Sequence, residues 1–527
     1  MTLTPRYTRW LEMLAARDHS VLALFLLAAV VVLFVYHARR WRRRLLWMGV
    51  AAFWWTLVVF LFIHPPVIPR PTFGQLMEQP LWYDETFTVA VSRLPFNQMI
   101  QAVAGDVHPP LWYVIEWVTI RLLGESAWAV RTPALIFGLA SVYLTYRLAL
   151  AMGYERRTAL WAAGLLAAMP AQVYYAQEAR MYTVLQFFIL LATLGLYEHR
   201  LLLMGLALVG ALYTHNLGLL FVTSVGLLAL FHWWANWRTY WSEGVLLGSG
   251  VFLAWVPWLR VMAGQVQGIG AGFWIQDCGI GGYLLPLYRL TLGMGAVDFV
   301  EQHAAVAAVG LAALAWWAAK RDLNDGYDLL QFVLWPAGAL VLVSEVWTPL
   351  YLERIFIVSL PFQVILATSA LRRLRSEHRR PILVVLLPVL AICLLFQSKG
   401  TAGYGAFAQN ILEQYEEGDV IYHVNLASYI QLNYYLPEAE HVCWPDAGNL
   451  QQALTVETQE AMGIRRAEAA EGWDGEGRLL VVGLLHPLTT ASEERALEAA
   501  LELGQARKLV AWEDSELVTA GVWEVRP

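Results

Sequence analysis

Long apolar stretches recur along the first 400 residues of this chain, separated by short polar segments. The runs near residues 20–36 and 45–64 each approach the roughly 20 residues that a helix needs to cross a bilayer. The first run is followed by "ARRWRRR" and not by a small-residue cleavage site, so we interpret it as a retained span rather than a signal peptide. The pattern predicts a polytopic α-helical membrane protein.

Charge divides the chain into two parts. From residue 401 onward there are 7 Lys and Arg against 21 Asp and Glu, whereas the first 400 residues hold 29 basic and 21 acidic residues. Such a break predicts a domain boundary, with a transmembrane domain at 1–400 and a soluble extracytoplasmic domain at 401–527. The acidic second part also argues against nucleic acid as a partner.

Basic loops set the expected orientation. The five arginines between residues 39 and 44 predict a cytoplasmic loop, so the next span leads outward and 65–128 becomes the external catalytic loop. Later basic loops fit about 12 transmembrane helices if residues 109–124 lie along the outer surface as an interfacial helix. If that segment crosses instead, one other assignment must change, and we expect it to be that of the stretch 283–300, which is otherwise external or re-entrant.

The segment after a last span near 381–397 has a different pattern. "GDVIYHV", "RLLVVGLL", "KLVAWE" and "AGVWEV" predict strands, and "SEERALEAALELG" predicts an amphipathic helix closed by glycine. These elements predict a small α/β domain. We expect a structural or acceptor-docking module, because no glycine-rich phosphate loop or catalytic acid pair is evident in it.

Acidic residues on the external side are the first candidates for chemistry. In "LWYDETFTVAVSRLPF" the pair Asp84 and Glu85 follows a predicted span in an aromatic setting, where a carboxylate could take a proton from a hydroxyl. In "DVHPPLW" two prolines mark a helix start, flanked by Asp106 and His108 as contacts for a divalent metal ion or a phosphate. A solvated acid pair and a structural histidine are the alternatives.

External arginines are unexpected for a membrane protein and therefore informative. Arg180 in "YYAQEARMY" and Arg354 in "YLERIF" are candidates to hold a lipid phosphate. The alternative is that each pairs with the glutamate beside it, Glu178 or Glu353. His215 in "LYTHNLG" is a candidate for substrate or metal binding, with an ordinary interfacial histidine as the alternative.

The order of these motifs resembles a known family. An external "YDE", then "D-x-HPPLWY", "AVRTPALIFGLASVYLTYRLA", "ERRTALWAAGLLAAMPAQVYYAQEARMYT" and "ERIFIVSLP" look like the GT-C superfamily of integral-membrane glycosyltransferases. The similarity is to the branch of protein O-mannosyltransferases and aminoarabinose transferases. It covers roughly residues 45–235 and continues more weakly to about 370.

The resemblance implies an inverting transfer of sugar from a polyprenyl-phosphate-linked donor to an acceptor hydroxyl. It implies Asp84 as general base, with Glu85 as the second member of the acid pair. Arg180 and Tyr182 match the "ARMY"-type motif and Arg354 the late arginine, which the resemblance assigns to the donor phosphate. The expected partners are that donor, membrane lipids and a glycan, lipid or protein acceptor, at the extracytoplasmic face of the plasma membrane.

Two departures from the family pattern weaken parts of this assignment. Val107 stands where aminoarabinose transferases have an acid two positions before the prolines, which puts their type of metal site at Asp106 and His108 in doubt. Ile355 follows Arg354 where an aromatic residue is commoner, so the phosphate contact there is less secure. The C-terminal domain also lacks resemblance to a β-trefoil, so a protein acceptor is not implied.

Two other classes of protein share part of this pattern. A polytopic lipid or glycan transporter or flippase would be expected to carry ionisable residues near the middle of the bilayer and an internal repeat. A non-catalytic scaffold that binds glycan through its external domain would also show this two-part pattern. The clustering of charge at the external face favours the enzyme.

Overall fold

The computed structural model describes residues 77–234, 236–270, 326–374, 411–445, 456–473, 477–485, 491–513 and 519–526, with a few single residues between these ranges. The chain divides into two compact units, Met1–Pro69 with Leu371–Ala391 and Arg70–Ala370 with Ile392–Pro527. Nearly all described residues belong to the second unit. The spans expected near 20–36, 45–64 and 381–397, and the stretch 283–300 apart from Tyr283, lie outside the described residues.

Three short helices form the region that carries the acid pair. They are α5 (Tyr83–Arg93), α6 (Phe96–Gly105) and α7 (Leu111–Leu123). Helix α5 begins after Trp82, whose backbone N–H donates to the carboxylate of Glu85 at 3.3 Å, and its acidic first turn suits the positive end of the helix dipole. Pro95 and the pair Pro109–Pro110 precede α6 and α7, as expected for the prolines of "HPP".

Helix α7 covers most of the segment expected at the membrane surface. Its 13 residues span about 20 Å at 1.5 Å per residue, which is less than the roughly 30 Å hydrocarbon core of a bilayer. One side of it is buried through Trp112 and Tyr113, whereas Leu122 and Leu123 at its end are exposed. Its length and exposed end are compatible with the interfacial placement.

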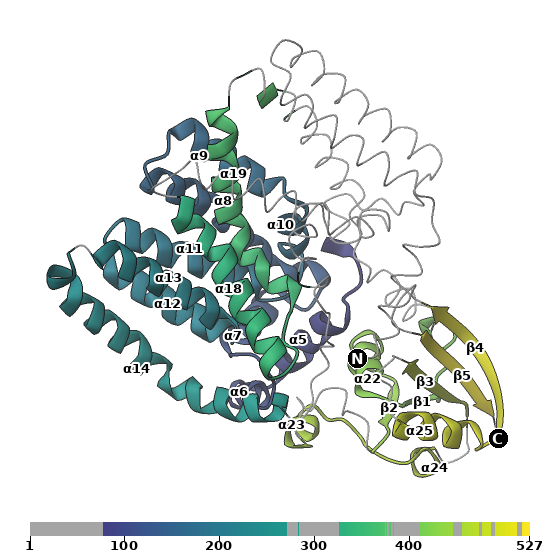
Figure 1. The fold of residues 1–527 in the computed structure, drawn as a ribbon. Coiled ribbons are helices and arrows are strands. Elements are labelled where there is room, and N and C mark those ends of the chain that lie inside the picture. The colour runs from purple at the N-terminus through teal and green to yellow at the C-terminus, as the bar shows by residue number, and fades with distance from the viewer. Residues whose placement is uncertain are drawn as a thin grey trace, which may run out of the picture. The chain divides into compact units, whose positions relative to one another are not determined.

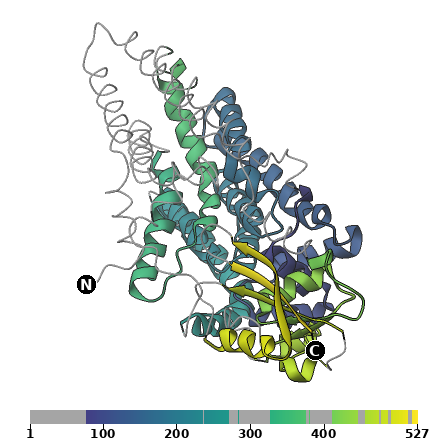
Figure 2. The ribbon, with the colours of Figure 1, turned by 90° about the vertical axis from the view of Figure 1, so that its right-hand side faces the viewer.

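The main body is a bundle of apolar helices (Figures 1 and 2). Four helical segments are long and apolar enough to cross a membrane: Ala127–Ala151, Arg238–Gln267, Gly326–Val346 and Glu353–Arg373. The described elements of the bundle are α8 (Ala127–Ala151), α9 (Arg156–Ala167), α10 (Pro170–Tyr175), α11 (Tyr182–Tyr197), α12 (Leu201–Thr214), α13 (Gly218–Trp234), α14 (Trp237–Gly270), α18 (Gly326–Val346), the 3₁₀ helix η1 (Glu353–Ser359) and α19 (Leu360–Arg373). Large exposed apolar side chains such as Leu139 and Leu206 agree with a membrane location.

Helix α11 is the centre of this bundle. It packs against α8, α12 and η1, and also contacts α13. Twelve of its 16 residues are buried, including Tyr182 at its first position. Because α11 begins next to Arg180 and η1 carries Arg354, this packing sets where the two arginines lie.

The C-terminal part contains a five-stranded mixed sheet in the order β2-β1-β3-β5-β4 (Figure 1). Strand β1 is parallel to β2 and β3, whereas β5 is antiparallel to β3 and β4. The strands are β1 (Val420–His423), β2 (Glu440–Cys443), β3 (Leu479–Leu485), β4 (Gln505–Glu513) and β5 (Thr519–Arg526), and the helices are α22 (Leu426–Tyr435), α23 (Val456–Ala461), α24 (Ala469–Gly472) and α25 (Ala491–Leu501). The four expected strands and the expected helix are present. The sequence analysis missed β2, whose four residues "EHVC" are too few to show an alternating pattern.

Helix α22 contacts the region of the acid pair. The hydroxyl of Tyr435 donates to the carbonyl of Leu81 at 3.1 Å, and the hydroxyl of Tyr434 donates to the carbonyl of Glu125 at 2.8 Å. Apolar side chains of α22 such as Ile430 share a buried cluster with Phe87 of α5. The sheet domain therefore supports the first turn of α5, where Asp84 lies.

Candidate active site

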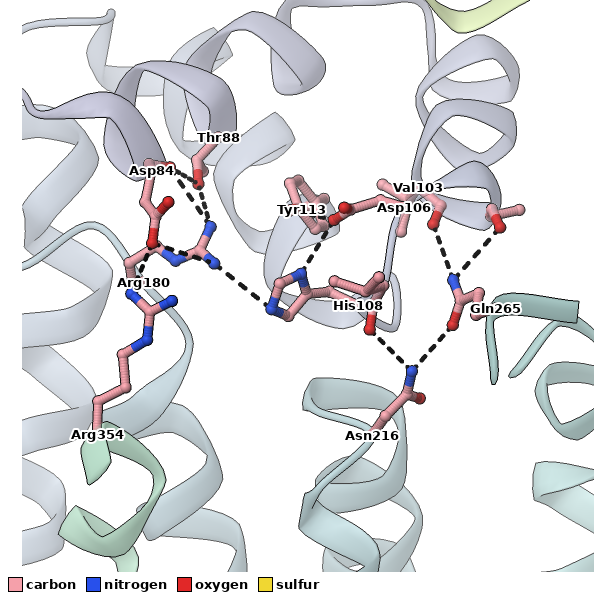
Figure 3. Close-up of polar contacts among 12 residues, drawn as sticks. Asp84, Thr88, Val103, Asp106, His108, Tyr113, Arg180, Asn216, Gln265 and Arg354 are labelled. Carbon is pink, nitrogen blue, oxygen red and sulfur yellow. Dashed lines mark hydrogen bonds and ion pairs between the residues drawn. The ribbon is translucent and has the colours of Figure 1, made fainter. Parts of the chain in front are cut away.

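Three charged side chains from separate parts of the chain lie in contact: Asp84, Arg180 and Arg354 (Figure 3). Asp84 lies in the first turn of α5, Arg180 in the loop before α11 and Arg354 in η1. The Oδ2 atom of Asp84 is 2.7 Å from Nη1 of Arg354 and 3.7 Å from Nη2 of Arg180. One carboxylate thus lies between two guanidinium groups, a cationic arrangement able to bind a further anion.

Arg180 is the more firmly held of the two arginines. Its Nη1 donates to the backbone carbonyl of Asp84 at 3.4 Å and lies 3.5 Å from the hydroxyl of Thr88, which itself donates to that carbonyl. The side chain of Arg180 is only 3% exposed, compared with 15% for Arg354 and 14% for Asp84. Arg354 and Asp84 are therefore the members of this group that a substrate can reach more easily.

His108 links the arginines to the "HPP" segment (Figure 3). Its Nδ1 lies 3.0 Å from Oδ2 of Asp106, which also accepts a hydrogen bond from the hydroxyl of Tyr113 at 3.2 Å. A carboxylate can only accept, so Nδ1 carries the proton and Nε2 is left as an acceptor for Arg180, 3.5 Å away. The partners thus define one neutral tautomer of His108.

Electrostatics fix the charge states of these groups. Burial acts to raise the pKa of Asp84, but Arg180 and Arg354 outweigh it and hold the pKa below its usual value. Burial lowers the pKa of His108, against the opposing influence of Asp106. At neutral pH the site therefore holds an ionised Asp84 and an uncharged His108.

Two amides hold the loop that carries His108 (Figure 3). The side-chain amide of Asn216 donates to the carbonyl of Val107 and to Oε1 of Gln265, both at 2.9 Å. Gln265 in turn donates to the carbonyls of Val103 and Ala104 at 3.3 Å. The sequence analysis missed both amides; Asn216 follows His215 in the "THN" turn, whereas nothing marked Gln265 within α14.

His215 lies beside these groups at the end of α12. Its ring packs edge-to-face on His108 with centroids 5.2 Å apart, and it lies 6.1 Å from the ring of Tyr182. Tyr182 also lies beneath Arg354, whose Cζ is 5.6 Å from the ring centroid. His215 and Tyr182, both named from the sequence, therefore adjoin the arginines in space.

Glu85 lies apart from Asp84 although the two are adjacent in sequence. It is fully buried and forms a two-point ion pair with Arg131 of α8, with distances of 2.8 and 2.6 Å. Its Oε1 also accepts from the backbone N–H of Ala179 at 2.8 Å. Glu85 thereby holds the residue next to Arg180, and these contacts suit a positioning role rather than contact with substrate.

Arg131 is a third functional residue that the sequence analysis missed. It donates to three backbone carbonyls ahead of α5, those of Met77, Gln79 and Pro80. The signal was present in "AVRTPAL", because an arginine within an otherwise apolar helix of membrane length requires a partner.

Asp106 and His108 do not fit a divalent metal site. The proton-bearing nitrogen of His108 faces Asp106, and its other nitrogen faces the guanidinium of Arg180. No group of three or more His, Cys, Asp or Glu within the described ranges is arranged to hold a metal.

Part of the chain is similar to a known family of membrane transferases. Residues 98–265 match the family model of dolichyl-phosphate-mannose-protein mannosyltransferases, a segment that includes His108, Arg180 and His215. The resemblance to the GT-C branch expected from the sequence is confirmed.

Among solved structures, the fold is similar to that of ArnT from Cupriavidus metallidurans. The apo structure of that protein aligns with a TM-score of 0.55 and 16% identity, covering 89% of this chain and 98% of ArnT. The structure of the same protein bound to undecaprenyl phosphate aligns with a TM-score of 0.53 and 15% identity, covering 84% and 94%. At this identity the likeness concerns the fold. No curated protein matches the sequence significantly.

Proposed function

We propose that this chain is an inverting glycosyltransferase that moves a sugar from a polyprenyl-phosphate-linked donor to an acceptor hydroxyl. The observation that carries the proposal is the Asp84 carboxylate placed between Arg180 and Arg354, which combines a base with an anion-binding pair. The ArnT structure bound to undecaprenyl phosphate and the family of dolichyl-phosphate-mannose-dependent enzymes support the class of donor. The acceptor is a glycan, lipid or protein hydroxyl.

Binding of the donor comes first in this mechanism. The donor phosphate approaches the exposed side of Arg354 and shares the guanidinium groups that Asp84 engages in its absence. When the arginines also pair with the phosphate, their stabilisation of the ionised Asp84 weakens. The pKa of Asp84 then rises from its lowered value and the carboxylate becomes a better base. Donor binding thus activates the base.

Transfer then follows as a direct displacement. Asp84 removes the proton of the acceptor hydroxyl, and the oxygen forms a bond to C1 of the sugar as the bond from C1 to the phosphate oxygen breaks. The electron pair of that bond leaves with the lipid phosphate, and the proton stays on Asp84 until it exchanges with water. Arg180 and Arg354 stabilise the charge that develops on the phosphate, and no metal ion is needed for this step.

The membrane arrangement is part of the proposal. Basic loops favour about 12 spans, with the site and the C-terminal domain on the extracytoplasmic face of the plasma membrane. We place the domain boundary at residue 400, with residues 401–527 forming the external α/β domain. The two tyrosine contacts of α22 with the region of α5 favour a role for this domain close to the site.

Transfer by the purified protein tests the proposal. Full-length protein in detergent or nanodiscs is mixed with radiolabelled polyprenyl-phospho-sugars and a cell-envelope acceptor fraction. We expect polyprenyl phosphate and glycosylated product in equal amounts, with the anomeric configuration inverted. Movement of intact donor lipid across vesicles without loss of its sugar would instead identify a flippase, and a retained configuration would exclude the single displacement.

A further inference from the structure

Three neighbouring neutral groups near Arg354 are among the buried side-chain atoms that have no hydrogen-bond partner within the described residues. They are the hydroxyls of Tyr175 and Tyr182 and the Nε2 atom of His215. The residues are 2%, 0% and 4% exposed, respectively. Buried polar atoms without partners are uncommon because each loses its hydrogen bonds to water, so three together indicate a place where a ligand or water completes the bonding.

The three groups belong to neighbouring side chains, which together are called the neutral surface below. The rings of Tyr175 and Tyr182 lie 5.3 Å apart, and those of Tyr182 and His215 lie 6.1 Å apart. They come from α10, the start of α11 and the turn between α12 and α13. Tyr182 also lies beneath Arg354. This neutral surface therefore adjoins the charged pair without being part of it.

The hydrogen bonds of His215 determine what it offers a ligand. The backbone N–H of Leu217 donates to Nδ1 of His215 at 3.1 Å, so Nδ1 is the acceptor. Burial, with His108 and the two arginines, lowers the pKa of His215 well below its usual value and keeps the ring neutral. A neutral ring with Nδ1 as acceptor carries its proton on Nε2, which is the atom without a partner.

The chemistry of this surface fits a sugar better than a phosphate. Two phenolic hydroxyls both donate and accept, one imidazole N–H donates, and aromatic rings surround them. Neutral donors and acceptors among rings match the hydroxyl groups and apolar faces of a pyranose or pentopyranose, whereas the neighbouring arginines match the anionic phosphate. A donor with its phosphate on Arg354 would bring its sugar within reach of this surface.

We propose that Tyr175, Tyr182 and His215 form the subsite for the sugar ring of the lipid-linked donor. The inference rests on the proposed function and adds where the sugar binds and which groups select it. Tyr182 thereby acts on the sugar rather than on the phosphate. His215 acts as a donor to a sugar oxygen.

Binding of two lipids distinguishes a sugar contact from a phosphate contact. The probes are undecaprenyl phosphate, which has no sugar, and whichever polyprenyl-phospho-sugar the wild type binds most tightly among mannose, glucose and aminoarabinose donors. Affinities are measured on the full-length protein in nanodiscs by competition with a labelled lipid phosphate. The variants are Tyr175→Phe, Tyr182→Phe and His215→Asn, the last of which keeps an acceptor near the Nδ1 position for Leu217 but removes Nε2.

We expect each variant to bind the sugar-bearing lipid about tenfold more weakly, the loss expected for one buried hydrogen bond, and undecaprenyl phosphate as the wild type does. His215→Gln, which places an amide N–H near the Nε2 position, should recover most of the affinity. Tyr213→Phe is the matched control, because it removes a hydroxyl that already donates within the protein, to the carbonyl of Ala254. It should leave the ratio of the two affinities unchanged.

Other outcomes would overturn the inference. If a variant weakens the binding of both lipids equally, the residue contacts the phosphate or maintains the fold and does not contact the sugar. If neither affinity changes, water molecules satisfy the hydrogen bonding of these groups. Failure of the proposed function gives a separate result, because the wild type would then bind neither lipid and Arg354→Met would change nothing.

Discussion

Arg354 and Asp84 lie 270 positions apart in the sequence, and their Nη1 and Oδ2 atoms are 2.7 Å apart. Arg180 lies on the other side of the same carboxylate oxygen at 3.7 Å. A base that is paired with two cations binds a proton weakly, so the group is suited to catalysis only when another anion takes part of the cationic charge. In the proposed mechanism a donor phosphate is that anion, so donor binding would raise the basicity of Asp84.

Replacement of Asp84 by Asn tests the assignment of the base. We expect turnover to fall about 10²–10⁴-fold, the usual contribution of a positioned general base, while undecaprenyl phosphate still binds. Binding is retained or strengthened because the arginines lose an internal competitor. Glu125→Gln is a matched control, since Glu125 pairs with Arg93 away from this group. Near-normal transfer by the Asp84→Asn protein would exclude Asp84 as the base.

The pH dependence of the reaction reports the pairing of Asp84. The lowered pKa of Asp84 means that kcat/KM for the donor falls only when the pH drops through that lowered value. Removing a cation raises the pKa, so Arg354→Met should move this acid limb to higher pH, and Arg354→Lys should move it less. Because the usual aspartate pKa is about 3.9, rates measured between pH 4 and 8 should show little of this limb in the wild type and more of it in Arg354→Met. If the acid limb of kcat/KM lies at the same pH in Arg354→Met as in the wild type, a group other than Asp84 determines that limb.

Replacement of Glu85 should act through position and stability. Leaving Arg131 buried without its carboxylate costs about 3–5 kcal/mol, so Glu85→Gln should lower the Tm and displace the Ala179–Arg180 segment. The double variant Glu85→Leu with Arg131→Met should regain much of the Tm, because apolar pairs often replace buried ion pairs without loss. Its activity should stay low since Ala179 has lost its acceptor. Full activity in the double variant would contradict a positioning role.

Local patterns predicted the candidates at this site but not their pairing. Asp84 was identified as one of an acid pair after a predicted span, whereas Arg180 and Arg354 were identified because arginines on the expected external face are unusual. The order of motifs linked them. Which residues meet depends on how α11 packs against α8 and η1, and no local pattern records that packing. The same limit hid Gln265, which is one polar residue within a long helix until its carbonyl partners at Val103 and Ala104 are seen.

In the fold, too, local features were predicted and features that depend on tertiary contacts were not. Long apolar runs and alternating strands were predicted, because hydrophobic periodicity is a local property. The short strand β2 was missed because a four-residue strand needs its neighbour β1 to be identified. Glu85 was paired with Asp84 by adjacency in sequence, whereas one step along a helix turns a side chain by about 100° and sends it toward Arg131.

Chelation tests whether the arginines replace a metal ion. Because His108 directs one nitrogen to Asp106 and the other to Arg180, we expect EDTA to leave both donor binding and transfer unchanged. His108→Gln, which retains a group able to accept from Arg180, should keep more activity than His108→Leu. Loss of activity on chelation, restored by one divalent ion, would show that Asp106 and His108 rearrange to bind metal when substrate is present.

A pair of histidines in the C-terminal domain should make its stability depend on pH. Nε2 of His423 lies 2.9 Å from Nδ1 of His441, whose Nε2 donates to the carbonyl of Leu436 at 2.7 Å. Burial lowers the pKa of both rings, and for His423 the neighbouring His441 adds to this effect. The folded state therefore binds fewer protons than the unfolded state below the usual histidine pKa of about 6.5, and stability is lost as the pH falls from there toward the lowered values.

The loss is at most about 1.4 kcal/mol per pH unit for each histidine, so between pH 7.5 and 5.0 it should be measurable. Hydrogen–deuterium exchange of peptides from 420–443, corrected for the intrinsic rate, should speed up at pH 5.0 more than that of bundle peptides. His423→Phe should reduce the difference, whereas His199→Asn, a change at an exposed histidine with positive φ that asparagine tolerates, should not. Equal acceleration in the wild type and His423→Phe would show that His423 does not contribute to the pH dependence. Helix α22 begins beside this pair, and the tyrosines at its other end donate to the carbonyls of Leu81 and Glu125. Because these contacts hold the region of α5, we expect donor turnover to decline over the same pH interval.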